Sequence, residues 1–298
     1  MSTLISFDYA IKYLLKDKGN YDIVEGFISA ILQAEGYPAV KITSLLESES
    51  NKEEKDLKRS VADLMVRDEQ GVFYIVEIER ISTETFLHKA CFNTSRLIVD
   101  TLESGNDYQT IKKVFHISLL YFAWSNSQKA LHHGKTIFKE MDSEHPIDLQ
   151  LVTEQGKTVD LSPIFPEYFL ISVPLFDDII RSELDEWLYV VKHSEVKADF
   201  KSPYMQKVAK RLNVLTLSQA EKYTYEKYMR EIYIQRDQMN AATHAAKEEG
   251  IVIGEARGKA EALTEVVKNL QAQGVSIDLI KTATGLSLNE IQSILVNS

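Results

Sequence analysis

The sequence predicts an α/β protein with an all-helical C-terminal region. Two β-type runs, 60–67 and 72–79, are separated by a short polar turn that ends at Gly71, a pattern typical of a hairpin. Residues 114–124 (VFHISLLYFAW) are almost continuously apolar, as expected for a strand buried on both faces. From Ser182 onward, most of the chain has the pattern of helices.

Two helices and one strand are predicted before the hairpin. Residues 7–16 and 21–34 carry apolar side chains at helical spacing, and a Gly-Tyr-Pro turn ends the second helix. Residues 40–46 fit a first strand. The charged run SESNKEEKDLK that follows predicts a loop into the hairpin.

Beyond the hairpin, residues 83–101 predict a long helix and residues 136–141 a further strand. Three prolines in 160–180 indicate extended, turn-rich chain. The predicted C-terminal helices cover 182–191, 205–215 and 218–249, followed by two short helices around Gly285. The predicted domains are 1–200, 201–249 and 250–298.

Two features of the C-terminal region indicate that it packs against another chain or another part of the protein. Gly250, Gly254 and Gly258 are four residues apart, which on a helix predicts either close packing with another backbone or a hinge. The two short terminal helices resemble a helix-turn-helix, but Lys281 is their only basic residue. A docking or assembly element is therefore favoured over a DNA reader.

The net charge of −10 over 298 residues argues against a generally basic nucleic-acid coat. Residues 201–250 are the exception, with nine Lys and Arg against six Asp and Glu, and a solvated helix face is the simpler interpretation. No apolar run approaches the length of a membrane span. The single cysteine, Cys91, excludes an internal disulfide and a zinc cluster, so a cytoplasmic protein is predicted.

The hairpin carries the candidate catalytic residues. Asp63 shares a strand face with apolar residues, and Glu77 and Glu79 end an otherwise apolar row. If the loop is 69–71, paired positions sum to 140 and Asp63 lies opposite Glu77. Opposed like charges destabilise a sheet unless a cation neutralises them, so this pair predicts a divalent metal site. The alternative is that the acids decorate a solvated face.

The histidines are weaker candidates for a catalytic or metal site. His116 lies in the buried strand and is expected to be a core histidine. His132 and His133 are adjacent, so on a strand they face opposite ways and form a poor metal pair, and we expect them on the surface. The sequence contains no P-loop and no dinucleotide-binding glycine motif, and no hydrolase triad stands out.

An ordered set of five segments resembles the bacterial recombination-promoting nuclease/putative transposase (Rpn) family of the PD-(D/E)XK nuclease superfamily. The segments are FDYAIKYLL, the hairpin with Asp63, Glu77, Ile78 and Glu79, SGNDYQTIKKVFHISLLYF, EEGIVIGEARG and TGLSLNEIQSIL. The resemblance covers nearly the whole chain. It implies a PD-(D/E)XK restriction-endonuclease-like mixed sheet flanked by helices.

The resemblance also implies a metal site, and the chain departs from the family pattern at one position of that site. Mg²⁺ or Mn²⁺ would be bound by Asp63, Glu77 and the backbone carbonyl of Ile78. The third motif position, a lysine or glutamine in the superfamily, is Glu79 here, which can bind a second metal or act as a base but supplies no positive charge. Lys58 or Arg59, before the first strand, could replace that charge. Asp8 in the first helix is a further candidate.

The function implied by the resemblance is a metal-dependent DNA endonuclease acting in recombination or transposition. Its expected partners are DNA and a second copy of the chain in a homo-oligomer, with a dimer the expected form, and no membrane. The alternative is a nuclease-fold protein that has lost its chemistry and binds DNA or a protein partner through its C-terminal helices.

Overall fold

The computed structural model describes residues 4–14, 21–46, 62–102, 107–160 and 164–296. Contacts along the chain divide it into two compact units, Met1–Tyr225 and Glu226–Ser298. The first unit has the mixed α/β fold that the sequence predicts, and the second is helical.

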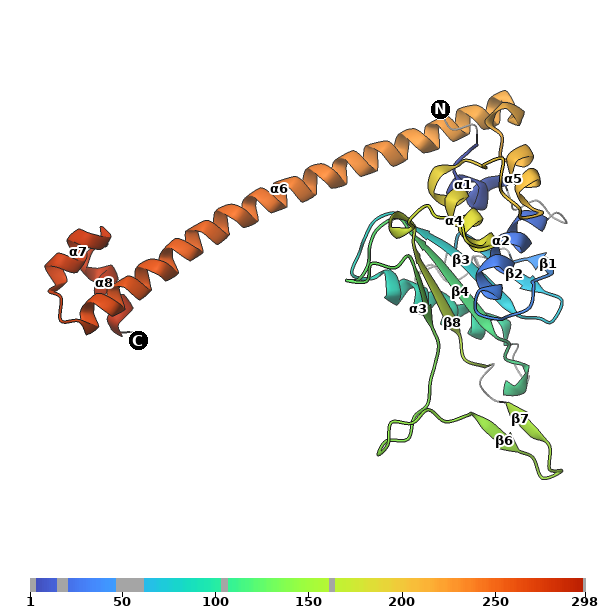
Figure 1. Cartoon of the computed structure of the whole chain (residues 1–298), viewed down its shortest axis with the longest axis horizontal. Coiled ribbons are helices and arrows are strands. Elements are labelled where there is room, and N and C mark those ends of the chain that lie inside the picture. Colours follow the sequence, from blue (N-terminus) through green and yellow to red (C-terminus); the bar gives the residue numbers. More distant parts are fainter. Residues whose placement is uncertain (1–3, 15–20, 47–61, 103–106, 161–163, 297–298) are drawn as a thin grey trace, which may run out of the picture. The chain divides into compact units, whose positions relative to one another are not determined.

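A six-stranded mixed sheet forms the centre of the first unit (Figure 1). Its strands are β1 (Ile42–Leu45), β2 (Leu64–Asp68), β3 (Phe73–Glu79), β4 (Val114–Leu120), β5 (Leu131–Gly134) and β8 (Glu167–Ser172). In space their order is β1-β2-β3-β4-β8-β5. The β3-β4 and β4-β8 pairs are parallel, and the other pairs are antiparallel. A separate two-stranded sheet pairs β6 (Gln150–Val152) with β7 (Thr158–Asp160).

The β2-β3 hairpin has the predicted register. Leu64 pairs with Val76, and Asp68 donates its backbone N–H to the carbonyl of Val72 at 3.0 Å, so paired positions sum to 140. Gly71 closes the turn with φ +82, a left-handed conformation that costs glycine little. Continued by one residue, the register places Asp63 opposite Glu77.

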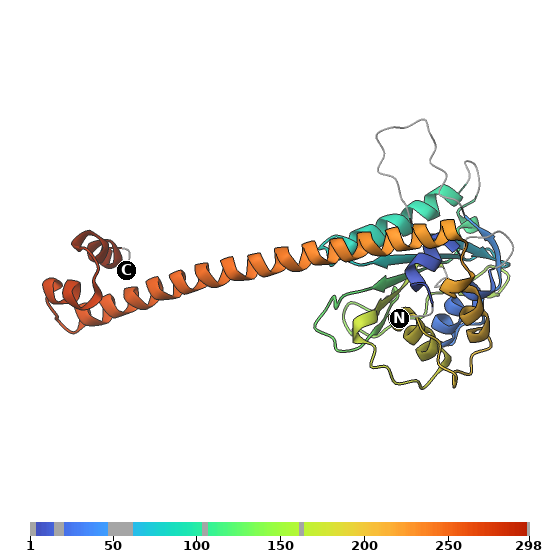
Figure 2. The ribbon, with the colours of Figure 1, turned by 90° about the horizontal axis from the view of Figure 1, so that it is seen from above.

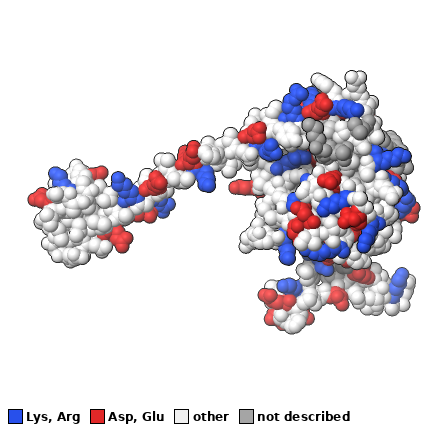
Figure 3. Space-filling view, turned by 45° about the horizontal axis from the view of Figure 1, so that its top comes forward, with Lys and Arg blue, Asp and Glu red and all other residues white. Residues whose placement is uncertain are grey.

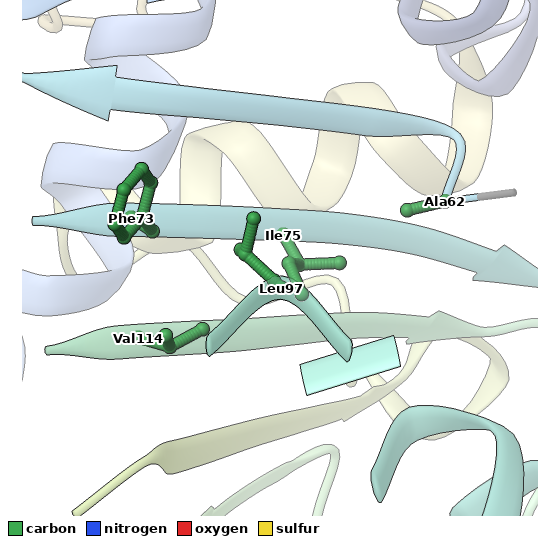
Figure 4. Close-up of a cluster of buried hydrophobic side chains, with 5 residues drawn as sticks. All are labelled: Ala62, Phe73, Ile75, Leu97 and Val114. Atoms are coloured by element: carbon green, nitrogen blue, oxygen red, sulfur yellow. The ribbon is translucent and has the colours of Figure 1, made fainter. Parts of the chain in front are cut away.

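Helices cover both faces of the sheet, with α3 (Phe86–Thr101) on one side and α2 (Asp22–Gln33) and α4 (Glu183–His193) on the other (Figures 1 and 2). The α3 crossover connects β3 to β4, as a parallel pair requires. Under α3 lies a buried apolar cluster that joins the hairpin to the helix (Figure 4). Its members are Ala62, Phe73, Ile75, Leu97 and Val114.

An aromatic cluster fixes the N-terminal segment against the opposite helix layer. This segment is α1 (Phe7–Tyr9), continued by a π-helix, η1 (Ala10–Leu14). Phe7 packs edge-on against Phe27 of α2 at 4.9 Å between ring centres, and both rings contact Trp187 of α4. The contacts hold η1 beside the end of β3.

The remaining helices follow β8, apart from one short 3-10 turn before β4. They are α5 (Met205–Arg211), α6 (Gln219–Ala272), α7 (Ile277–Thr284), α8 (Leu288–Val296) and the short 3-10 turns Tyr108–Thr110, Val173–Leu175 and Val214–Thr216. Ser218 and Glu221 form a capping box at the start of α6. In the second unit, Val267 of α6, Ile280 of α7 and Ile291 of α8 form a small buried core.

The structure corrects three sequence predictions. The strand expected at 136–141 is instead β5 at Leu131–Gly134. The proline-rich stretch 160–180 contains β8, which lies between β4 and β5 in the sheet; its prolines fall outside the strand, so they do not interrupt the ladder. The helix expected to end near Glu249 continues through all three spaced glycines to Ala272.

Within the described residues, the helices are too short or too polar to cross a bilayer. On the face shown in Figure 3, Lys and Arg side chains are intermixed with Asp and Glu. With a net charge of −10, attraction to a nucleic acid would have to come from local charges and not from the molecule's overall field.

Candidate active site

The first carboxylate of the site, Asp63, directly precedes β2. Its Oδ2 accepts a hydrogen bond from the backbone N–H of Ile78 at 2.8 Å. The side chain of Asp63 therefore accepts the hydrogen bond from β3 that a backbone carbonyl would accept if β2 extended further. Its Oδ1 lies 3.4 Å from the Nζ of Lys12, which belongs to η1. Because Asp68 and Val72 form a hydrogen-bonded pair, Asp63 and Glu77 fall at a non-hydrogen-bonded position, where side chains approach most closely.

The second carboxylate, Glu77, is buried between β3, β4 and α3, with 1% of the residue exposed. Asn93 of α3 donates its side-chain amide to Oε1. His116 Nε2 on β4 lies 3.6 Å from Oε2, beyond hydrogen-bond distance, and Lys89 Nζ lies 3.8 Å from the same oxygen. Burial alone would raise the pKa of Glu77, but the neighbouring His116, Lys89 and Asn93 outweigh it and lower that pKa.

His116 is buried, as the sequence predicts, but it also forms part of the surroundings of Glu77. Its Nδ1 lies 3.0 Å from the hydroxyl of Thr94 on α3. Its Nε2 has no hydrogen-bond partner among the described residues and lies toward Glu77. His133 is not the surface residue we expected: its ring lies between Glu35 and Glu167, on β5, which is three strands away from β3.

The third carboxylate, Glu79, ends β3 and forms an ion pair with α3. Lys89 Nζ donates to Glu79 Oε1 at 2.7 Å. Burial opposes the charge of Lys89, but Glu79, Glu77 and Asp63 together outweigh it and raise the pKa of the lysine. One ammonium group therefore interacts with all three predicted site carboxylates.

Asp8, a further predicted site residue, lies elsewhere. Asp8 is fully buried and pairs with Arg80, whose Nε donates to it at 3.0 Å. Arg80 also lies 4.5 Å from the ring centre of Tyr121 and points away from Glu79, as the alternation of the strand predicts. The structure therefore places Asp8 with Arg80, and not among the carboxylates around Lys89. Lys58 and Arg59 lie outside the described residues.

The donor chemistry of the site fits a hard divalent cation. Among the described residues there is no group of three or more His, Cys, Asp or Glu side chains that could hold a metal. Mg²⁺ requires fewer protein ligands, since it commonly binds one or two carboxylates and keeps several waters. Asp63 and Glu77 supply two carboxylates, and the carbonyl of Ile78 points to the same side of β3 as the N–H that contacts Asp63.

Four residues at the site were not identified from the sequence as site residues: Lys12, Lys89, Asn93 and His116. A signal for two of them was present. Lys89, Asn93 and Leu97 are spaced by four residues, so they share one face of the predicted helix, with polar residues at one end and an apolar residue at the other. Such a face indicates that the start of the helix covers a polar site.

Comparison with known proteins gives one match. Residues 5–159, just over half of the chain, match the family described as PD-(D/E)XK nuclease family transposase. The match covers β1 to β5 of the central sheet but not β8, and it includes every predicted site residue. No curated protein and no solved structure matches. The family resemblance and the fold predicted from the sequence are confirmed.

Proposed function

This chain belongs to the PD-(D/E)XK nuclease family transposases, and on that premise we propose that it is a metal-dependent DNA endonuclease acting in recombination or transposition. The observation that carries the proposal is the opposition of Asp63 and Glu77 at the end of the β2-β3 pair, with lysine ammonium groups beside both carboxylates. Buried like charges persist only where a cation compensates them.

Asp63, Glu77 and the carbonyl of Ile78 would hold the metal, for which Mg²⁺ and Mn²⁺ are the candidates. When bound, such an ion lowers the pKa of a coordinated water and stabilises charge on the phosphate oxygens. The protein fixes the ligands: Ile78 N–H orients Asp63, and Asn93 orients Glu77. The lowered pKa of Glu77 keeps this buried carboxylate ionised at neutral pH, as a ligand for a hard cation must be.

The reaction is hydrolysis of a phosphodiester. The oxygen of a water molecule forms a bond to phosphorus, the bond from phosphorus to the leaving oxygen breaks, and the leaving oxygen gains a proton while the attacking water loses one. The sequence offers Glu79, two residues beyond Glu77 on the same face of β3, as the acceptor of that proton or as a ligand of a second metal, although in the structure Glu79 is paired with Lys89. Asp8, Lys58 and Arg59 remain candidates that rest on the family resemblance alone.

We also propose that the second unit joins two copies of the chain. Along α6, apolar residues recur every seven positions: Ile232, Met239, Ala246, Ile253, Ala260 and Val267. Val267 is buried by α7 and α8, whereas Met239 and Ile253 are 41% and 59% exposed. A seven-residue repeat aligns these side chains in one stripe along the helix, and we propose that a second helix packs against this stripe. A homodimer would bring two active sites to one duplex.

The experiment that tests the enzymatic proposal is plasmid cleavage with Mg²⁺, Mn²⁺, Ca²⁺ or EDTA. Nicking or linearisation with Mg²⁺ or Mn²⁺, and none with EDTA, is expected. Cleavage that persists in EDTA contradicts a metal-dependent nuclease. Inactivity on every DNA form, together with DNA binding that weakens steeply with salt, would favour a nuclease-fold binding protein.

A further inference from the structure

The carboxylate-rich end of β3 receives its positive charge from α3. Glu79 carries a negative charge at the strand's end, so the strand itself supplies no cation there. Lys89, ten residues later, places its ammonium 2.7 Å from Glu79 and 3.8 Å from Glu77. The side chain of Lys89 is 45% exposed, so part of it can be reached from solvent.

We propose that Lys89 is a catalytic residue that donates a hydrogen bond to the scissile phosphate, and that Glu79 is the residue that positions it. This inference rests on the nuclease function proposed above. Lys89 transfers no proton: its N–H contacts a non-bridging phosphate oxygen while the bond from water oxygen to phosphorus forms and the bond to the leaving oxygen breaks. Donors aimed at developing charge are a major source of catalysis.

The charge balance favours a catalytic lysine here. Asp63, Glu77 and Glu79 contribute three negative charges, and Lys12 and Lys89 contribute two positive ones, which leaves a net charge of −1. With one divalent cation bound, the sum becomes +1, which matches the single negative charge of a phosphodiester. Without Lys89 the sum would be zero, and the site would lose its attraction for the phosphate.

Lys89 is better placed than Lys12 for this task. Among the described residues, these two lysines are the ones whose ammonium groups pair with the site carboxylates. Lys12 contacts Asp63, and its side chain is 27% exposed. Lys89 lies beside both Glu77 and Glu79 and is the more exposed of the two.

Helix stability does not explain a lysine at this position. Lys89 lies close to the N-terminus of α3, where the helix dipole disfavours positive charge. No acidic residue lies in the first turn of α3 to offset it. The compensation comes from the sheet, through Glu79 and Glu77, so the arrangement serves the site at the end of β3 and not the helix.

The test compares single-turnover DNA cleavage and Ca²⁺ affinity by calorimetry in full-length variants. Lys89→Gln should slow cleavage by about 100-fold or more. It should leave Ca²⁺ affinity unchanged or tighter, because a cation beside Glu77 has been removed. Arg96→Gln is the matched control: Arg96 lies on the same helix in an exposed ion pair with Asp100, and its loss should change neither quantity.

A charge exchange separates catalysis from structure. The double variant Glu79→Lys/Lys89→Glu keeps the ion pair but moves the cation to the strand, and it should recover most of the cleavage lost in Lys89→Gln. Undiminished cleavage by Lys89→Gln overturns the catalytic role of Lys89 and leaves the proposed function standing. A parallel loss of Ca²⁺ affinity in Lys89→Gln also overturns it, because Lys89 would then only hold the ligands. A wild-type chain that cuts no DNA overturns both this inference and the proposed function.

Discussion

Glu77 is the residue on which the site depends, because it is charged and almost wholly buried. Removing a carboxylate from water costs several kcal/mol unless partners compensate. Here the compensation comes from the Asn93 amide, the Lys89 ammonium and the nearby His116 ring. Replacing such a group by apolar residues is often neutral or stabilising, so a buried charged cluster is poor support for stability. A function in binding a cation explains the cluster better.

Removal of either metal-site carboxylate should abolish cleavage. Asp63→Asn and Glu77→Gln each keep the side-chain shape but lose a negative charge and a hard oxygen ligand. We expect Mg²⁺-dependent nicking to fall by more than about 100-fold while the far-UV circular dichroism is retained. Asp100→Asn on the exposed side of α3 is the control and should cut normally. Normal nicking by either site variant would contradict the assignment.

The pKa of Glu77 predicts a pH-dependent contribution to stability. Its pKa in the folded protein lies below the ordinary value of 4.5, so ionised Glu77 stabilises the folded state at neutral pH. That contribution is lost as the pH falls from about 4.5 through the lower folded pKa. Urea unfolding between pH 7 and pH 3 should therefore show a smaller acid-induced loss in Glu77→Gln than in wild type. Equal losses would show that Glu77 does not titrate as the structure indicates.

At the residue scale, the sequence predicts the strand carboxylates better than the groups around them. Asp63 and Glu77 follow from strand alternation and a turn of known length, both of which are local properties. The packing of α3 and β4 against the hairpin brings three further residues to these carboxylates: Lys89, Asn93 and His116. The helix face that carries Lys89 and Asn93 can be read from spacing, but its rotation against the sheet depends on contacts distant in the sequence.

At the element scale, a helix or strand is predicted correctly when the residues that determine it are close together in the sequence. The hairpin, α2, α3 and β4 have strong periodicity or a clear turn residue, and each forms close to its predicted position. The strand β8 is only six residues long and follows Pro166 directly. It is a strand because β4 and β5 pair with it on both sides, which the local pattern does not reveal.

Gly26 tests how tightly α2 is packed. A Cβ at this position would lie 2.5 Å from Cγ of Tyr204, a ring fixed against Trp187. Gly26→Ala should therefore destabilise the first unit by about 1–3 kcal/mol, despite the better helix propensity of alanine. Thermal unfolding measures the effect. In the double variant with Tyr204→Ala, the two losses should be less than additive, and full additivity would show that the ring is not what restricts this position.

At the scale of the whole molecule, the family match and the second unit pose separate questions. Residues 5–159 include five of the six strands of the central sheet and its carboxylates, whereas β8 and the helices from α4 onward lie beyond the match. Most of α6 between Tyr233 and Ala262 is exposed and includes Ile251, Val252 and Ile253. Exposed apolar side chains gathered on one helix are typical of an interaction site.

The three spaced glycines, Gly250, Gly254 and Gly258, do not serve packing inside the second unit. A methyl group added at any of them would have no described atom within 4 Å, apart from atoms of the neighbouring helix turns.

The proposed seam along α6 predicts which substitutions separate two copies of the chain. Ile253 belongs to the seven-residue repeat, whereas Ile251, of the same type and 51% exposed, lies on another side of the helix. Ile253→Lys should lower the mass measured by light scattering at micromolar concentration, because a charge would have to be buried in the seam. Ile251→Lys, which adds the same charge two residues away, should leave the mass unchanged. If the proposed function holds, the Ile253→Lys chain should still nick plasmid but linearise it slowly, since each strand of a duplex requires its own site. A wild-type chain that is already monomeric would contradict the seam, and loss of mass in both variants would show that the interface is not confined to the repeat.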